Sequence, residues 1–351
     1  MNILYGVSGE GLGHVFEAIE IVSRLRREGH AVKVLTYGDR ACGLLEAFQP
    51  TRIEGIHLQF NARGMSLFDT VSRNLKIFPF YVRNWRRLRR EIAAFQPDAV
   101  ITAYEPFSTL VAHALGKPLI SMDNQNELLH LPASEEGSFA LKLAQLATRV
   151  CTYGAAHYIV KSFHRMDGGG TNVHFVSPII QSEIRRLEPR EGRHVLVYLT
   201  KANPELISVL KSMDETFVVY CNNRVGEEGN ISYRAQGESY LSDLCDCKAI
   251  IGTTGFSLIA DSIYLRKPYY GVPLRKQFEQ THNAHFLRSS GLGEFSEGTS
   301  REDLERFLAS LPVYRERLAR YRLDPAEQEE TLLALLREVG AGSRAHSSPT
   351  R

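Results

Sequence analysis

The sequence has few of the features that are typical of secreted, metal-binding or membrane-spanning proteins. Its five cysteines are scattered and odd in number, which argues against a disulfide framework. Cys245 and Cys247 have no second pair that would complete a metal site. No apolar run approaches the ~18 residues of a membrane span, and the chain starts without the basic leader and apolar core of a signal peptide. We therefore expect a cytoplasmic protein.

An excess of charge of one sign is also absent. The chain has 42 Lys and Arg against 40 Asp and Glu, a net charge of +2, so no overall field indicates a nucleic-acid partner. With 43% hydrophobic and 23% charged residues, the composition is that of a globular protein. A length of 351 residues predicts two domains of ordinary size.

The most informative stretch lies in the second half of the chain. An apolar run at 249–251 predicts a buried strand, and residues 252–255 form a Gly/Thr turn. Residues with helical spacing follow, and this helix must end before Pro268. The next strand and helix are expected at 269–272 and 277–287.

A strand, a glycine turn and a helix start are suited to bind an anion, because the first N–H groups of the helix point outward and the helix dipole favours negative charge. Asp261, six residues after Gly255, can accept hydrogen bonds from sugar hydroxyls. Glu279, Gln280 and Asn283 gather within one turn of the next helix and also suit a polyol. The alternative is an ordinary α/β unit with a polar helix face.

These residues form the pattern TGFSLIAD, KP, VPL and FEQTHNA, which resembles the nucleotide-sugar half of GT-B glycosyltransferases. The similarity is greatest to bacterial relatives of the lipid-II-forming N-acetylglucosaminyltransferase. The resemblance implies that the turn and helix start bind the donor diphosphate through Thr253, Thr254, Gly255, Phe256 and Ser257. It also implies that Asp261, where the family usually has Glu, binds the ribose, and that Glu279 and Gln280 bind the donor sugar.

The chain opens with a strand at 3–7 and a second strand at 31–36, separated by a helix and a turn that contains Gly11 and Gly13. This order predicts a parallel sheet. The glycine spacing is G-x-G-x-G rather than the G-x-G-x-x-G of dinucleotide-binding proteins. Asp39, after the second strand, keeps a nicotinamide-binding alternative open.

His14 ends this turn and begins the helix. It could hydrogen-bond the turn, or it could act as general base on an acceptor hydroxyl, because a neutral imidazole accepts a proton near pH 7. The string GEGLGH resembles the first loop of the same GT-B group, in which glycines and a histidine face the interdomain cleft. Glu17 stands where that group often has Arg.

Two acidic residues follow later strands of the first half. Glu105 follows a strand at 98–102, and Asp123 follows a strand at 118–122. Since polar groups past the carboxyl ends of parallel strands face the ligand crevice, either carboxylate could orient His14 or serve as the base in its place. Capping of the following helices is the competing interpretation. The E-P and D-N-Q motifs also resemble the family's acceptor-side loops.

After a third strand expected at 51–60, residues 66–95 read as mostly helical and combine arginines with aromatic residues. The residues that define this pattern are Arg83, Trp85, Arg86, Arg87 and Arg90. A basic amphipathic helix of this kind is typical of proteins at an anionic membrane surface. A solvated basic face over an ordinary packed stripe is equally compatible, and nothing else in the sequence favours nucleic acid.

The second half begins with a strand at 194–199, and the residues after it, Thr200 and Lys201, stand where a diphosphate could also be held. Helices are expected over 301–338, with breaks at the prolines, and the resemblance implies that the last helix crosses back to the first domain. A linker near 180–192 divides the chain. The expected parts are an acceptor domain at 1–185, a nucleotide-sugar domain at 186–338 and a disordered tail at 339–351.

Together these patterns predict an α/β fold of two Rossmann-like domains that face a cleft, the GT-B arrangement. The resemblance implies an inverting, hexosyltransferase-type enzyme that moves a sugar from a nucleotide-diphosphate donor, by analogy a UDP-sugar, to a glycan or lipid acceptor of the cell envelope. No Asp-x-Asp occurs in a fitting context, so we expect no metal and no cofactor. The basic helix favours a peripheral location on the inner face of the plasma membrane. Two alternatives stay open: a GT-B-fold nucleotide-sugar epimerase, which would turn over donor without acceptor, and a non-catalytic nucleotide-sugar or lipid-binding protein, which would bind UDP without turnover.

Overall fold

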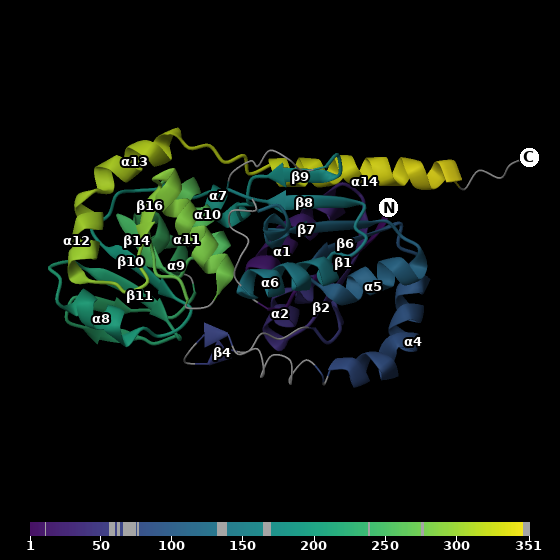
Figure 1. Cartoon of the computed structure of the whole chain (residues 1–351), viewed down its shortest axis with the longest axis horizontal. Helices are drawn as coiled ribbons and strands as arrows, with labels where there is room; N and C mark the ends of the chain where they lie inside the picture. The colour runs from purple at the N-terminus through teal and green to yellow at the C-terminus, as the bar shows by residue number, and fades with distance from the viewer. Residues whose placement is uncertain are drawn as a thin grey trace, which may run out of the picture. The chain divides into compact units, whose positions relative to one another are not determined.

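A computed structural model gives the fold of the chain, which divides into two compact units (Figure 1). The first contains residues 1–179 and 324–351, and the second contains residues 180–323. The residues described are all those of the chain except 11, 56–59, 62–63, 66–74, 76, 132–138, 164–169, 238, 275–276 and 347–351. The last helix belongs to the first unit, as the resemblance implies, so residues 324–338 lie outside the second unit, to which the expected boundaries assign them.

The first unit is built on a parallel sheet of order β3-β2-β1-β6-β7-β8-β9. Its strands are β1 (Asn2–Val7), β2 (Ala31–Thr36), β3 (Thr51–Arg52), β6 (Ala99–Ala103), β7 (Leu119–Asp123), β8 (His157–Lys161) and β9 (Val173–Val176). A separate antiparallel pair consists of β4 (Phe60–Asn61) and β5 (Gly64–Met65). The third strand expected within 51–60 is present at its start as β3, and residues 56–59 lie outside the described residues. After β3, the Ile53 N–H donates one more hydrogen bond to the sheet. Gly55 then lies so close to the Tyr37 ring that a Cβ added to it would be 2.0 Å from the ring.

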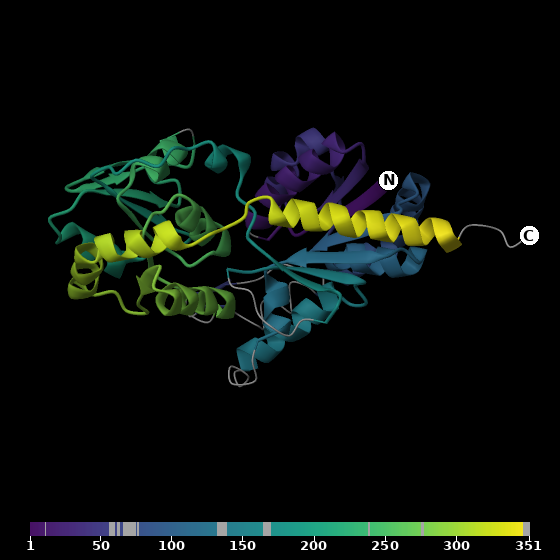
Figure 2. The same ribbon diagram turned by 90° about the horizontal axis from the view of Figure 1, so that it is seen from above.

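Helices cover both faces of this sheet. They are α1 (Leu12–Arg27), α2 (Asp39–Leu44), η1 (Glu46–Phe48), α4 (Ile77–Phe95), α5 (Pro106–Leu115), η2 (Gln125–Leu129), α6 (Phe139–Cys151) and α14 (Glu327–His346). Apolar residues of α1 and α14 form one core with the sheet, and those of α4 and α5 form another on the opposite face. Figure 2 shows α14 lying along the strands of this unit. Residues 339–346, expected in a disordered tail, are helical, and 347–351 lie outside the described residues.

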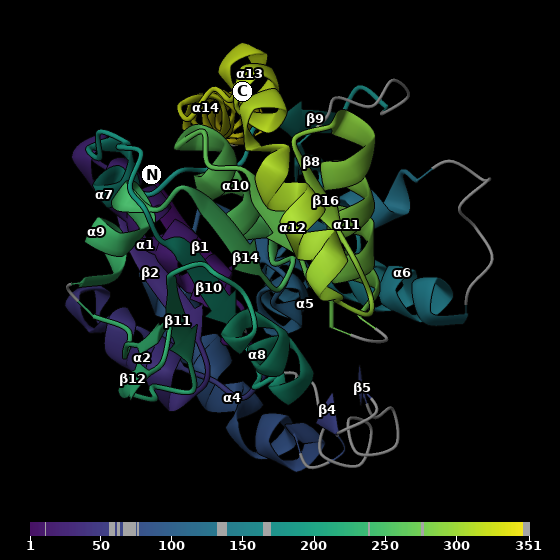
Figure 3. The ribbon, with the colours of Figure 1, turned by 90° about the vertical axis from the view of Figure 1, so that its left-hand side faces the viewer.

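The second unit is built on a sheet of order β12-β13-β11-β10-β14-β15-β16, parallel except at β12 (Figure 3). Its strands are β10 (Val195–Leu199), β11 (Phe217–Cys221), β12 (Gly226–Glu228), β13 (Ile231–Tyr233), β14 (Ala249–Gly252), β15 (Tyr269–Gly271) and β16 (Gly293–Phe295). Its helices are α7 (Ser182–Arg185), α8 (Pro204–Lys211), α9 (Ser239–Asp246), α10 (Phe256–Tyr264), α11 (Phe278–Ser290), α12 (Arg301–Ala309) and α13 (Leu311–Arg320). Helices α8, α12 and α13 share one core with the sheet, and α9 packs on the opposite face.

Both sheets are doubly wound, and each has a point where the order of its strands reverses. In the first unit this point lies between β1 and β6, and in the second it lies between β10 and β14. Open parallel sheets bind ligands beyond the carboxyl ends of the strands at such a switch point, because the connections there diverge and leave a crevice. Among the described residues, no helix is long and apolar enough to cross a bilayer.

Candidate functional site

The switch point of the second unit brings together loops that are more than fifty residues apart in the chain. Thr200 follows β10 and Thr253 follows β14, and their hydroxyls lie 2.9 Å apart. Thr200 and the next residue, Lys201, are exposed, whereas Thr253 is 4% exposed. Two loops predicted separately from the sequence to hold a diphosphate therefore meet at one point in the structure.

The turn after β14 presents the start of α10 without a side-chain cap. Gly255 is the N-cap residue, and within the described part of the chain no side chain accepts from the first N–H groups of this helix. No neighbouring atom lies within 4 Å of the position that a Cβ of Gly255 would occupy. The N–H groups of a helix start, with a glycine that leaves room in front of them, form a favourable environment for an anion.

Buried hydrogen bonds fix the shape of this turn. Thr254 donates its hydroxyl to the carbonyl of Gln280 at 2.6 Å, and the Asn283 amide donates to the carbonyl of Thr254 at 3.0 Å. From the other side, the Tyr269 hydroxyl donates to the carbonyl of Thr253 at 2.7 Å. Thr254 is completely buried, and Asn283 and Gln280 are 3% and 6% exposed. The side chains of Thr254 and Asn283 and the backbone carbonyl of Gln280 therefore help to hold the turn in place, whereas the Gln280 side chain accepts from the Leu274 N–H at 2.9 Å.

Two carboxylates lie near this turn. Asp261 is on α10 and is 7% exposed, and Glu279 is half-buried in the first turn of α11. Burial, and after it the negative charge of Asp261, raise the pKa of Tyr240 well above its usual value, which places the Tyr240 phenol within electrostatic range of that carboxylate. Ser257, in the first turn of α10, is half-buried.

Tyr240 belongs to an aromatic and polar cluster that sequence reasoning missed. Its ring packs edge-on against Tyr198 and Tyr220, with centroids 5.9 and 5.2 Å apart. Asp243, one turn further along α9, accepts from the Tyr220 hydroxyl and from the Arg234 guanidinium, each at 2.6 Å. No local sequence pattern joins these residues, because Tyr198 lies on β10, Tyr220 on β11 and Arg234 just after β13.

In the first unit, His14 and Asp123 face each other across the carboxyl ends of β1 and β7. His14 Nδ1 lies 3.4 Å from Asp123 Oδ2, and the two side chains are 11% and 0% exposed. Neither atom makes a hydrogen bond to any described residue. The second oxygen of Asp123 accepts from the backbone N–H of Gln125 at 2.9 Å, and the Tyr104 ring is stacked on the imidazole with centroids 6.4 Å apart. Asp123 therefore combines the two functions that the sequence left as alternatives, since it caps the next turn and also faces His14.

Glu105 is a helix cap. Its two carboxyl oxygens accept from the backbone N–H groups of Phe107 and Ser108, both at 2.7 Å, at the start of α5. The side chain is completely buried, and this burial raises the pKa of Glu105 to about 7, although the two backbone hydrogen bonds lower it. Of the two interpretations of Glu105, capping is the one that describes its contacts.

A buried ion pair joins α1 to β8. The Lys161 ammonium donates to the Glu17 carboxylate, and the two side chains are 1% and 8% exposed. Tyr5 on β1 is completely buried, and its hydroxyl has no hydrogen-bond partner among the described residues. The sequence singled out Glu17 as a departure from the family pattern, but it gave no indication of a pairing with Lys161, which lies 144 residues away.

The glycine turn before α1 passes close to β2. An added Cβ on Gly9 would lie 1.9 Å from the carbonyl oxygen of Tyr37, so only glycine fits there. Gly13 is in the first turn of α1, and Gly11, the other predicted acceptor-loop glycine, lies outside the described residues. Packing therefore requires that Gly9, in this turn, has no side chain.

Helix α4 has the two faces that the sequence predicts. Leu88 and Ile92 are completely buried, and the half-buried Trp85 ring packs edge-on against Phe107 with centroids 5.9 Å apart. The other face carries the exposed arginines Arg83, Arg86, Arg87, Arg89 and Arg90. Arg73 and Lys76, also part of the basic pattern, lie outside the described residues.

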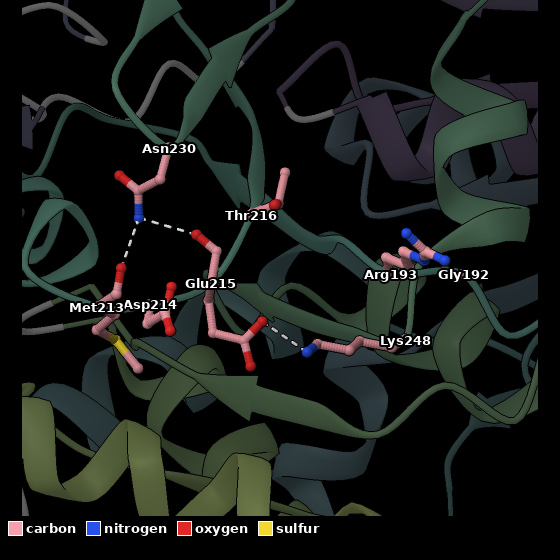
Figure 4. A pocket seen from close by; sticks show the side chains of 8 residues that line it. All are labelled: Gly192, Arg193, Met213, Asp214, Glu215, Thr216, Asn230 and Lys248. Carbon is pink, nitrogen blue, oxygen red and sulfur yellow. Dashed lines mark hydrogen bonds and ion pairs between the residues drawn. The ribbon is translucent and has the colours of Figure 1, made fainter.

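A surface hollow of about 510 Å³ lies at the amino ends of the second sheet, opposite its switch point (Figure 4). Its lining includes Arg193, Thr216 and Lys248, each of which stands shortly before a strand. Lys248 is paired with Glu215 at 2.6 Å, and the Asn230 amide donates to neighbouring carbonyls, as Figure 4 shows. In the described part of the chain, no group of three or more His, Cys, Asp or Glu side chains is placed to hold a metal ion.

Comparison with known proteins identifies the fold. The family model described as glycosyl transferase family 1 matches residues 1–312. Similar solved structures include a UDP-glucosyltransferase from Polygonum tinctorium (14% identity, 97% of this chain and 98% of that one, TM-score 0.69) and MurG from Acinetobacter baumannii (16% identity, 96% and 99%, TM-score 0.63). The glycosyltransferase SsfS6 from Streptomyces sp. SF2575, solved with thymidine diphosphate, is similar to the same degree (16% identity, 96% and 99%, TM-score 0.63). No curated protein matches the chain. The prediction of two Rossmann-like domains with the GT-B fold is confirmed.

Proposed function

The chain belongs to glycosyl transferase family 1 and is a glycosyltransferase of the GT-B type, and from this premise we propose that its donor is a nucleotide-diphosphate sugar, UDP-linked, and that transfer inverts the anomeric centre. One observation carries the donor assignment. The Thr200 and Thr253 hydroxyls meet beside the start of α10, whose N-cap is a glycine, at the switch point of the second sheet. A diphosphate placed there would receive hydrogen bonds from hydroxyls and helix-start N–H groups, and Lys201 would supply a positive charge. The solved structures of similar fold include proteins named for UDP and for thymidine diphosphate, which supports a nucleotide donor.

The remaining donor contacts follow from the positions of the two carboxylates. Asp261, on the helix whose start would hold the diphosphate, would accept hydrogen bonds from the ribose. Glu279 would accept from the sugar hydroxyls, and the bonds of Thr254, Gln280 and Asn283 would keep the turn in shape. The neighbouring amides stabilise the charge that develops on the diphosphate as it leaves.

His14 is the proposed general base. Asp123 Oδ2, which lies 3.4 Å from His14 Nδ1, would accept a hydrogen bond from Nδ1–H, and this would leave Nε2 as the nitrogen that accepts a proton. The acceptor O–H bond breaks as its proton moves to Nε2, the oxygen forms a bond to the anomeric carbon, and the diphosphate leaves with the electrons of the broken C–O bond. A positioned base of this kind accelerates transfer roughly 10²–10⁴-fold. Glu105 takes no part in this mechanism because both of its carboxyl oxygens cap α5.

We further propose that the acceptor is a glycan or lipid of the cell envelope, as for the lipid-II-forming relatives, and that the enzyme works at the inner face of the plasma membrane. The exposed arginines of α4 support this proposal, since each basic residue near an anionic leaflet contributes about 1 kcal/mol of attraction. Changing Arg86, Arg87 and Arg90 to Glu should abolish sedimentation with phosphatidylserine vesicles. A matched triple change of the exposed residues Arg301, Arg306 and Arg320 should leave it intact. Equal sedimentation of the two triple variants would contradict the membrane proposal.

Calorimetry with UDP, TDP, GDP and NAD tests the donor assignment. UDP should bind tightest, and Asp261→Asn should weaken it roughly ten- to hundredfold, the effect of losing a hydrogen bond to a charged group. Asp214→Asn, at the opposite end of the sheet beside the hollow, should bind UDP as the unaltered protein does. Tighter binding of NAD, or undiminished UDP binding by Asp261→Asn, would overturn the assignment.

Release of UDP from a panel of UDP-sugars and envelope acceptors tests the base. His14→Ala should lower kcat by 10²-fold or more and leave the Kd for UDP unchanged. Asp123→Asn should lower kcat as well, because an amide can stabilise the wrong tautomer of the imidazole. Wild-type turnover by His14→Ala would remove His14 as the base, and donor turnover without any acceptor would point to an epimerase.

A further inference from the structure

Two histidines lie close together on neighbouring strands of the first sheet. His157 begins β8, so it lies at the amino end of this strand and not at the carboxyl ends beside His14 and Asp123. His174 is the second residue of β9, the last strand in the order of the sheet, and it pairs in register with Ile159. Because side chains alternate between the two faces of a strand, both imidazoles lie on the same face of the sheet.

Each ring faces the other through one nitrogen. His174 Nε2 lies 3.5 Å from His157 Nδ1, and the ring centroids are 5.6 Å apart. At this distance one neutral imidazole can donate its N–H to the other. Both side chains are half-buried, and the proposed transfer reaction uses neither of them.

The face of the sheet that carries the pair is the one covered by α14. Ile159 belongs to the core that α1 and α14 form with the sheet, and α14 packs against β8 and β9 (Figure 2). Partial burial first, and then the neighbouring His157, lower the pKa of His174, whereas Glu338 on α14 raises it. The exposed Glu338 carboxylate is therefore within electrostatic range of the pair. An uncharged imidazole with a negative charge nearby is a suitable ligand for a cation.

The separation of the two nitrogens fits a metal ion that binds both. Zinc lies about 2.0–2.1 Å from an imidazole nitrogen, so two nitrogens on a tetrahedral zinc are about 3.3–3.4 Å apart. The 3.5 Å in the structure is close to this value, and a small rotation of each ring would direct both lone pairs at one ion. The ring that donates would then carry its proton on its other nitrogen. Because paired strands fix both backbones, binding would order little else.

We propose that His157 and His174 chelate a divalent transition-metal ion such as Zn²⁺, with water in its remaining positions. Imidazole suits Zn²⁺, Cu²⁺ and Ni²⁺, whereas Mg²⁺ and Ca²⁺ favour oxygen ligands. A site with two protein ligands agrees with the finding that no three metal-binding side chains gather in the described part of the chain. The ion ties β9, at the end of the sheet, to β8. It takes no part in transfer, so this inference does not depend on the proposed function.

Calorimetry with zinc chloride tests the site on protein that carries no affinity tag and has been freed of metal with EDTA. The unaltered protein should bind zinc, and His157→Gln and His174→Gln should each weaken its affinity roughly tenfold or more, because one nitrogen holds the ion less tightly than two. Magnesium chloride should not bind at this site.

His113→Gln is the matched control. His113 is exposed on the same unit, and its Nε2 lies 2.7 Å from the Tyr153 carbonyl oxygen. This variant should bind zinc as the unaltered protein does. Equal zinc affinity of the His113, His157 and His174 variants would show that the ion binds elsewhere and would overturn the proposal, as would an unaltered protein that binds no zinc.

A measurement on the unaltered protein keeps the proposal testable if a histidine variant does not fold. Crystals grown with one equivalent of zinc should show an anomalous peak, at the zinc absorption edge, between His157 Nδ1 and His174 Nε2. Anomalous peaks at other positions only, as adventitious binding would give, would reject the site. That result would leave the proposed function intact, because UDP binding and turnover are measured without added zinc.

Discussion

Replacing Glu105 with glutamine is expected to remove a pH dependence from the stability of the first unit. The carboxyl group is completely buried and accepts two backbone hydrogen bonds at the start of α5. Glutamine keeps the length of the side chain and one accepting oxygen but does not titrate. The change therefore tests the ionisation of Glu105 with little change of shape.

The expected magnitude follows from the pKa of Glu105, which burial raises from an ordinary value of 4.5 to about 7. Because the folded state binds this proton more tightly than the unfolded chain does, its contribution is fully present below pH 4.5 and is lost as the pH rises through 7. The difference corresponds to about 3 kcal/mol. The free energy of unfolding of the variant, relative to that of the unaltered protein, should thus rise by about 3 kcal/mol between pH 4.5 and pH 8.

The chain offers a suitable reporter for this measurement. Trp85 is the only tryptophan, and its ring packs edge-on against Phe107, beside the capped start of α5. Urea unfolding followed by tryptophan fluorescence at several pH values should therefore report on the first unit. Glu46→Gln, at an exposed position of η1, is the control and should show no such trend. A difference between Glu105→Gln and the unaltered protein that stays constant over this pH range would refute the reasoning.

Three further predictions concern packing. Gly9→Ala should destabilise the first unit by about 2 kcal/mol or more, because its Cβ would overlap the Tyr37 carbonyl, and the Trp85 unfolding curve checks this. Asn230→Ala should cost the second unit about 2 kcal/mol, measured by urea unfolding with circular dichroism, because its amide donates to three backbone carbonyls at 2.8–2.9 Å. Tyr269→Phe should lower the free energy of unfolding by about 1–2 kcal/mol in the same assay and weaken UDP binding, because the Thr253 carbonyl loses its hydrogen-bond donor. Unchanged UDP affinity would show that this bond does not support the turn after β14.

Local signals explain what could be predicted from the sequence. The bounds of the elements from β14 to α11 were predicted to within a few residues, because an apolar run, a Gly/Thr turn and Pro268 each act on neighbouring residues. The strands β9, β13 and β16 were missed because three or four residues are too short to show a period. The third strand, expected within 51–60, forms at Thr51–Arg52, and the sequence does not show that Gly55, just after it, packs against the ring of Tyr37.

The site shows the same limit. The strand ends that carry His14, Asp123, Thr200 and Thr253 could be found from the sequence because parallel strands leave their polar residues at one edge. Whether a side chain there holds the fold or faces a ligand depends on partners far away in the chain. The Thr254 hydroxyl donates to the backbone carbonyl of Gln280 on α11. The Lys161 ammonium donates to the Glu17 carboxylate, which is 144 residues away in the sequence.

The return of α14 to the first unit bears on how the protein can be divided or truncated. The helix contributes Leu332, Leu333, Leu335 and Leu336 to the core beneath α1, so a fragment ending at residue 179 would expose that core to water. Residues 180–323, by contrast, carry their own sheet and covering helices and are the natural piece to express alone. A stop codon near the end of the gene would therefore damage the half of the protein that is synthesised first.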